Sequence, residues 1–160
     1  MNGGEKFIAL VIGGLLVFSV IRNLTHVEEP HENDIPFYTT ATAELARKAT
    51  DLYRDNTCRS CHSLWSLKDA MQSVPAPMLD GIGSLRTEAW FYEYLSAPNP
   101  QLILPSRLKK KYQMPSFATM AEGDRRIMAS YLASLKVKDW YLEETKKQEQ
   151  EKLTGVDTSK

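Results

Sequence analysis

The chain has two cysteines, and both lie in the segment NTCRSCHSL, where a histidine follows the second: Cys58, Cys61 and His62. A disulfide between such near neighbours closes a very short loop and removes little entropy from the unfolded chain. The pair therefore indicates a redox, metal-binding or cofactor-binding role rather than a structural cross-link. Since this motif uses both cysteines, the chain has none left for a disulfide or a reactive thiol elsewhere.

Three kinds of site place cysteines at this spacing. A thioredoxin-like redox motif requires a preceding strand in a βαβ unit, whereas the residues before Cys58 have helical periodicity. A structural zinc ion needs four ligands, and the motif supplies three, so a histidine from elsewhere would have to complete the set. Covalent haem attachment uses all three residues, because two thiols on one helical turn add to the two vinyl groups and the histidine binds the iron. We therefore predict one covalently bound haem c.

An uncharged run of fifteen residues, FIALVIGGLLVFSVI, occupies positions 7–21. As a helix this run covers about 22 Å, less than the hydrocarbon core of about 30 Å, but the two residues after Arg22 lengthen it if that side chain reaches the interface. No A-x-A-like cleavage pattern of a signal peptide follows the run. We therefore predict a membrane anchor over residues 1–24, with the lipid bilayer contacted through residues 7–24.

The rest of the chain divides into a linker, a helical domain and a tail. Residues 25–41 form an acidic, proline-containing linker, and residues 138–160 form a charged C-terminal tail whose last dozen residues we expect to be disordered. Three helices are predicted within residues 42–137, and no strand is expected there. Trp140, Tyr141 and Leu142 are expected to form one apolar turn.

Local signals define where these three helices begin. The first has Thr42 as its N-cap and continues directly to the cysteine motif. The second covers Thr87 to Ser96 and ends before two prolines. A capping box of Thr119 and Glu122 opens the third. We expect the first and last helices to cross with their apolar faces in contact, so that Ala46 or Ala49 meets Tyr131 and Leu135.

A second axial ligand decides whether a haem with one histidine reacts with small molecules or only transfers electrons. Met114 in KKYQMPSFA is our candidate, because it lies 52 positions after His62 on a loop stiffened by Pro115. That separation lets the chain wrap the cofactor and reach its opposite face. Met71 and Met78 are too close to the histidine, and two others lie in the third helix or its first turn: Met120 and Met128.

The segments YRDNTCRSCH, PAPMLDGIG, WFYEYL, QMPSF and RRIMASYLASLK together make residues 42–137 resemble a class I monohaem c-type cytochrome. The resemblance implies the all-α cytochrome c fold, in which three main helices and loops surround one covalent haem, here preceded by a single transmembrane helix. It also implies that Cys58 and Cys61 hold the haem and that His62 and Met114 are its axial ligands.

The resemblance assigns roles to further residues. Pro77 matches the family proline whose carbonyl accepts the Nδ1 hydrogen of the axial histidine, which fixes the ring. Arg86 or Trp90 would donate a hydrogen bond to a haem propionate. A basic run near the exposed haem edge would dock an acidic redox partner: Arg107, Lys109, Lys110 and Lys111.

The anchor followed by this domain is similar to the membrane-bound cytochrome c subunits of bacterial respiratory complexes. We therefore predict a membrane-anchored one-electron carrier of a respiratory chain, single-pass in the bacterial cytoplasmic membrane, with its haem domain on the periplasmic side. Its partner would be a membrane redox complex, a soluble redox protein or both. With 20 basic and 20 acidic residues the chain has no net positive charge that would favour binding to nucleic acid. No small-molecule substrate is expected.

Two other functions remain open from the sequence. One is a fixed electron-entry subunit of a larger membrane oxidoreductase of the terminal oxidase or nitric oxide reductase type. The other is an enzyme or gas sensor with an open haem site, which requires that Met114 does not bind the iron. In the two electron-transfer functions no residue acts as acid, base or nucleophile, so the protein itself would not be an enzyme.

Overall fold

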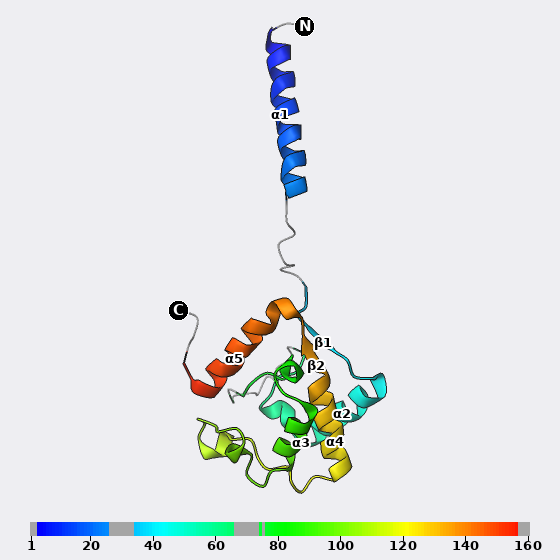
Figure 1. Cartoon of the computed structure of the whole chain (residues 1–160), viewed down its shortest axis with the longest axis vertical. Helices are drawn as coiled ribbons and strands as arrows, with labels where there is room; N and C mark the ends of the chain where they lie inside the picture. The colour runs from blue at the N-terminus through cyan, green and yellow to red at the C-terminus, as the bar shows by residue number, and fades with distance from the viewer. Residues whose placement is uncertain (1–2, 26–33, 66–73, 75, 157–160) are drawn as a thin grey trace. The chain divides into compact units, whose positions relative to one another are not determined.

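The structure is a computed structural model that describes residues 3–25, 34–65, 74 and 76–156. Contacts along the chain divide it into two compact units, Met1–Asp34 and Ile35–Lys160. The α-helices and strands follow one another in this order (Figure 1): α1 (Gly3–Thr25), β1 (Phe37–Thr39), α2 (Ala43–Asp55), α3 (Glu88–Ser96), α4 (Glu122–Ser134), β2 (Leu135–Val137) and α5 (Leu142–Thr154). Five short 3-10 turns lie between them: η1 (Cys58–Ser60), η2 (Ile82–Ser84), η3 (Pro100–Leu102), η4 (Lys110–Tyr112) and η5 (Asp139–Tyr141).

The first unit contains the helix α1, and the structure corrects what the sequence predicted for it. Across the described residues, no helix is long and apolar enough to cross a membrane. The physical reason is the length of the apolar run, which at fifteen residues falls short of the roughly 20 that span a hydrocarbon core. The predicted transmembrane helix and the single-pass location in a bacterial membrane are therefore wrong, and lipid contact through residues 7–24 has no support.

The second unit is built on three helices whose beginnings follow from their caps. Thr42 accepts a hydrogen bond from the backbone N of Leu45 and starts α2, and Thr87 does the same for Trp90 at the start of α3. Both beginnings agree with the sequence prediction. The predicted capping box of α4 is wrong, because α4 begins at Glu122 with Ala121 as an N-cap that offers no side-chain hydrogen bond.

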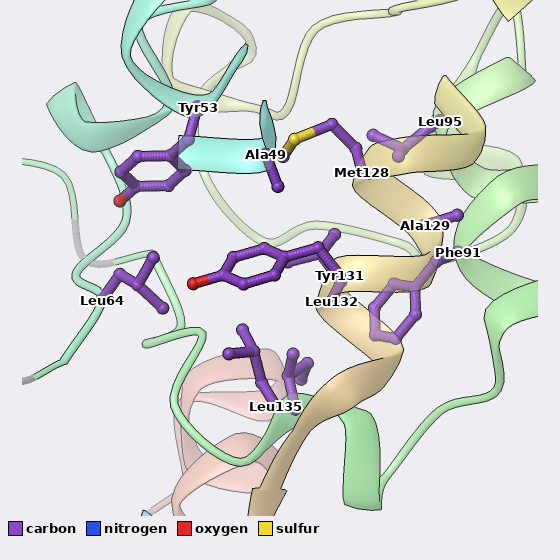
Figure 2. Close-up of a cluster of buried hydrophobic side chains, with 11 residues drawn as sticks. Ala49, Tyr53, Leu64, Phe91, Leu95, Met128, Ala129, Tyr131, Leu132 and Leu135 are labelled. Atoms are coloured by element: carbon purple, nitrogen blue, oxygen red, sulfur yellow. The ribbon is translucent and has the colours of Figure 1, made fainter. Parts of the chain in front are cut away.

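The core of this unit lies where α4 packs against α2 and α3. Ala49 of α2 and Ala129 of α4 are fully buried, so the small side chains let these helices approach closely. Tyr131 extends from α4 toward Tyr53 of α2 and Leu64 (Figure 2). The expected contact between the first and last helices of the domain is therefore present: Ala49, Tyr131 and Leu135 belong to one buried cluster.

Two short strands join the start of this unit to the segment after α4, although no strand was expected from the sequence. β1 pairs with β2 in antiparallel register, with Phe37 opposite Val137 and Thr39 opposite Leu135. Side chains extend the contact, because the hydroxyls of Thr39 and Ser134 lie 3.0 Å apart. Strands of three residues are too short for an alternating pattern to be recognised, so the prediction missed them.

The charged tail is also more ordered than the sequence suggested. Its residues form η5 and then the thirteen-residue helix α5, which ends at a left-handed Gly155. Residues 149–154 are therefore helical rather than disordered, whereas residues 157–160 of that prediction lie outside the described residues. Within the turn expected at Trp140–Leu142, the Trp140 ring is exposed and makes an edge contact with Tyr141.

Candidate functional site

The cysteine motif forms a separate turn after α2. The helix ends at Asp55, and Thr57 then takes a left-handed conformation with a φ of 57°. Backbone hydrogen bonds of 3.1 and 2.9 Å run to the carbonyl of Cys58 from the amides of Cys61 and His62. The two thiols and the imidazole are therefore held on one tight turn, and the expectation that the helix continues directly to Cys58 was wrong.

Two hydrogen bonds fix His62 in place. Its Nδ1 lies 2.7 Å from the carbonyl oxygen of Pro77, and its own carbonyl accepts a 2.6 Å bond from the hydroxyl of Tyr53. Since a carbonyl only accepts, Nδ1 carries the proton and Nε2 keeps a free lone pair. Burial lowers the pKa of His62 against the opposing effect of the Pro77 carbonyl, so the ring is neutral and able to bind a metal.

Both cysteines are half-buried. Burial, with a small contribution from the neighbouring Cys61, raises the pKa of the Cys58 thiol to about 11. The Sγ of Cys61 lies 3.7 Å from the hydroxyl of Ser60. No disulfide joins the two cysteines, so both sulfurs are available for thioether bonds to a haem.

A mainly apolar cavity opens above this turn and contains the predicted ligands from both ends of the domain. Cys58, Cys61 and His62 line it together with Met114, which is half-buried. Apolar and aromatic side chains from α3, α4 and the loops complete its walls: Leu79, Ile82, Trp90, Phe91, Tyr94, Leu95, Leu104, Phe117 and Leu132. Two thiols, a neutral imidazole and a thioether within one apolar cavity are a donor set that fits haem c.

The loop that carries Met114 is tied to the rest of the domain by side-chain hydrogen bonds. Gln101 donates from Nε2 to the carbonyl oxygen of Met114 at 3.1 Å, and Ser116 donates to the carbonyl of Ala97 at 2.8 Å. Another candidate, Met128, is buried in the hydrophobic core, as the sequence indicated. Met71 lies outside the described residues.

Arg86 and Trp90 also line the cavity, and they contact each other. The Arg86 guanidinium lies 5.3 Å from the centre of the Trp90 ring. Arg86 also forms a 3.1 Å ion pair with Glu149 of α5. The residues proposed as propionate donors are therefore brought to the cavity, but one of them already has a carboxylate partner that the sequence analysis did not find.

The structure separates the basic run into two parts. Of its four residues, Arg107 alone is among the described residues that line the cavity, and its Nε donates to the carbonyl of Lys152 at 3.0 Å. Lys109, Lys110 and Lys111 are exposed, the last two in η4. All four side chains are exposed, and their role in docking a partner stays a prediction.

Sequence reasoning missed the contribution of α5 to the cavity. Glu149, Lys152 and Leu153 are among the lining residues, and Thr145 and Gln148 face a neighbouring cavity that borders Pro77 and Asp80. The signal was present, because these five positions have the 3–4 spacing of one helix face. Apart from Leu153 they are polar, so a search for apolar periodicity passed over them.

Comparison with known proteins assigns the family. Residues 46–136 match the family model described as Cytochrome c, and this segment is more than half of the chain. It includes the cysteine motif and Met114 and ends before α5. No curated protein matches the chain. The chain belongs to the cytochrome c family, and its cofactor is covalently bound haem c.

Proposed function

We propose that this protein is a one-electron carrier of a respiratory chain, in which Cys58 and Cys61 hold one haem and His62 and Met114 are its axial ligands. The family supports electron transfer by haem in general terms. When bound, the haem supplies an Fe(III)/Fe(II) couple. One observation carries the proposal: both thiols, the imidazole and the Met114 side chain line the same cavity.

The role proposed for His62 is supported by its two hydrogen bonds. The carbonyl of Pro77 keeps the proton on Nδ1, so that Nε2 is the atom available to the iron. The hydroxyl of Tyr53 holds the backbone of the same residue from the side of α2. A histidine held by both its ring and its backbone changes little in position between the two redox states, which favours fast electron transfer.

The role proposed for Met114 depends on its loop. Pro115 restricts the backbone, and the amide of Gln101 holds the Met114 carbonyl, so the thioether is kept at the cavity. A thioether ligand favours Fe(II) and raises the reduction potential. With both His62 and Met114 bound, the iron would have no open site for oxygen or peroxide, as expected of a carrier rather than an enzyme.

The experiment is a comparison of Met114→Ala with wild type as purified, haem-loaded proteins. Wild type should give low-spin spectra, with the far-red charge-transfer band of sulfur-ligated ferric haem, and should not bind carbon monoxide. Met114→Ala should lose that band and bind carbon monoxide. Met120→Ala is the matched control, because Met120 is half-buried in the next turn but is not among the described residues that line the cavity. A wild type that binds carbon monoxide would instead favour a gas- or peroxide-handling protein.

A second function, a fixed electron-entry subunit of a larger oxidoreductase, has support from exposed apolar side chains. Leu102 in η3 is 83% exposed, and Trp140 is 49% exposed. Aromatic side chains such as that of Trp140 are enriched where two subunits meet. Co-purification of the tagged protein with other redox subunits would favour this function, and isolation as a single chain that reduces a soluble partner would favour the carrier.

A further inference from the structure

The helix α5 lies after the family-matched segment and still contributes to the haem cavity. The helix contacts the rest of the domain near its start, near its end and at one point between. Near its start, Tyr141 makes an edge-to-face contact with Phe37, with ring centres 5.7 Å apart. Near its end, Arg107 donates to the carbonyl of Lys152. Between these points, Glu149 reaches Arg86 beside η2. Three separate contacts therefore hold this helix against the domain.

The ion pair between Arg86 and Glu149 is well sheltered from water. The side chains are 25% and 14% exposed. By contrast, both side chains are more than half exposed in four ion pairs on the helix surfaces: Lys48–Glu44, Arg54–Asp51, Arg126–Glu122 and Lys146–Glu143. Arg86 is further fixed by the Trp90 ring and by a 2.9 Å hydrogen bond from its Nη1 to the carbonyl of Leu85. Charges in such a place are weakly screened, so their fields reach across the cavity that both residues line.

A fixed charge at this wall acts on the two oxidation states of a haem unequally. The Fe(III) state carries one more positive charge than the Fe(II) state, so a nearby carboxylate favours Fe(III) and a nearby guanidinium favours Fe(II). An arginine alone would therefore raise the reduction potential, and a glutamate alone would lower it. Where an arginine and a glutamate are paired, their opposite effects on the reduction potential largely cancel.

We propose that Glu149 tunes the reduction potential of the haem by neutralising Arg86 at the cavity wall. α5 is thus a functional addition to the family domain: it delivers one carboxylate to the electron-transfer site. The proposal depends on haem c in this cavity, which the family provides, and not on Met114 as the sixth ligand. The competing arrangement is that a haem propionate takes Arg86 as its partner and leaves Glu149 without influence on the potential.

The test is an optical redox titration of the full-length, haem-loaded protein in four variants. These are Glu149→Gln, Arg86→Gln, the double variant and the control Glu143→Gln. Glu143 is on the same helix, but its side chain is 83% exposed. Visible spectra of each variant show whether the axial ligands are unchanged, so a failure of the proposed ligation is recognised separately from a failure of this proposal.

We expect Glu149→Gln to raise the Fe(II)/Fe(III) ratio at a fixed ambient potential by about threefold to tenfold, where tenfold corresponds to about 59 mV for one electron. Arg86→Gln should shift the ratio by a similar factor in the opposite direction. The double variant should return close to wild type, and Glu143→Gln should not differ from it. A purely structural role for the ion pair predicts no such opposite signs and no such cancellation.

Two results would overturn the proposal. One is that Glu149→Gln behaves like Glu143→Gln, as expected if a propionate holds Arg86. The other is that both single variants shift the ratio in the same direction, as expected if the pair only shapes the cavity. If one single variant does not fold, the other, compared with Glu143→Gln, decides the question by the sign of its shift.

Discussion

The hydroxyl of Tyr53 donates a 2.6 Å hydrogen bond to the backbone carbonyl of His62, and so connects the helix α2 to the turn of the cysteine motif. Tyr53 is buried in the core beside Tyr131 and Leu64 (Figure 2). The position of the proposed iron ligand is therefore coupled to the packing of the helices.

Tyr53→Phe should lower the free energy of unfolding by about 1 kcal/mol, because the ring stays but the carbonyl of His62 loses its hydrogen-bond donor. Urea unfolding followed by circular dichroism measures the change. Tyr38→Phe is the control, since Tyr38 is 45% exposed and should tolerate the loss of its hydroxyl. Equal stability of the two variants would show that the buried bond contributes nothing.

Stability should fall at alkaline pH because of the same tyrosine. Burial raises the pKa of Tyr53 to about 12, above the ordinary value of 10.0 for an unfolded chain. The unfolded state therefore loses this proton first, and the contribution is complete below pH 10 and lost as the pH rises to about 12. Urea unfolding at a series of pH values should show a decline over this window that is smaller in Tyr53→Phe. A parallel decline in both proteins would assign it to other groups.

Gly83→Ala should destabilise the domain by about 2 kcal/mol or more, as expected for overpacking in a dense core. A Cβ at this position would lie against the backbone of α4, 2.3 Å from the carbonyl oxygen of Ala133. Gly123→Ala within α4 is a matched control, because a Cβ there meets nothing within 4 Å. It should stabilise by about 0.5–1 kcal/mol through helix propensity. Thermal unfolding of the two variants should thus move in opposite directions.

Lys109 and Lys110 should speed encounter with a negatively charged redox partner. Replacing both with glutamine should slow second-order electron exchange with such a partner by about tenfold at low ionic strength, and the difference should vanish in high salt. Stopped-flow absorption gives the rates. Arg47→Gln with Lys48→Gln removes two exposed positive charges from α2 and is the control. Equal slowing in both double variants would mean that net charge alone matters.

The sequence predicted those parts of the fold that are determined by residues close together in the chain. The threonine caps of α2 and α3 and the apolar face of α4 depend on neighbouring residues, and the helices lie where these patterns indicated. The cysteine motif likewise depends on spacing within five residues, and the structure folds it into one turn. The roles of its residues as haem ligands stay a prediction, as do the boundaries given to the linker, haem domain and tail.

The features that the sequence did not predict depend on tertiary contacts. The strands β1 and β2 are each three residues long. Each is a strand because it pairs with the other, which lies about a hundred positions away in the sequence. The helix α5 has a polar inner face whose partners, Arg86 and Arg107, come from distant loops. The apolar run of α1 has the composition of a membrane span, but no helix among the described residues is long and apolar enough to cross a membrane.

The pairing of β1 with β2 also determines how the domain responds to mechanical force. The first strand begins and the second strand ends at the same side of the ladder, where Phe37 faces Val137. Tension applied through the segments before β1 and after β2 therefore loads the ladder in an unzipping geometry. Its hydrogen bonds break one after another, beginning with the bond from the Lys138 amide to the Pro36 carbonyl and ending with the bond from the Thr40 amide to the Ser134 carbonyl, before the force reaches α2 and α4.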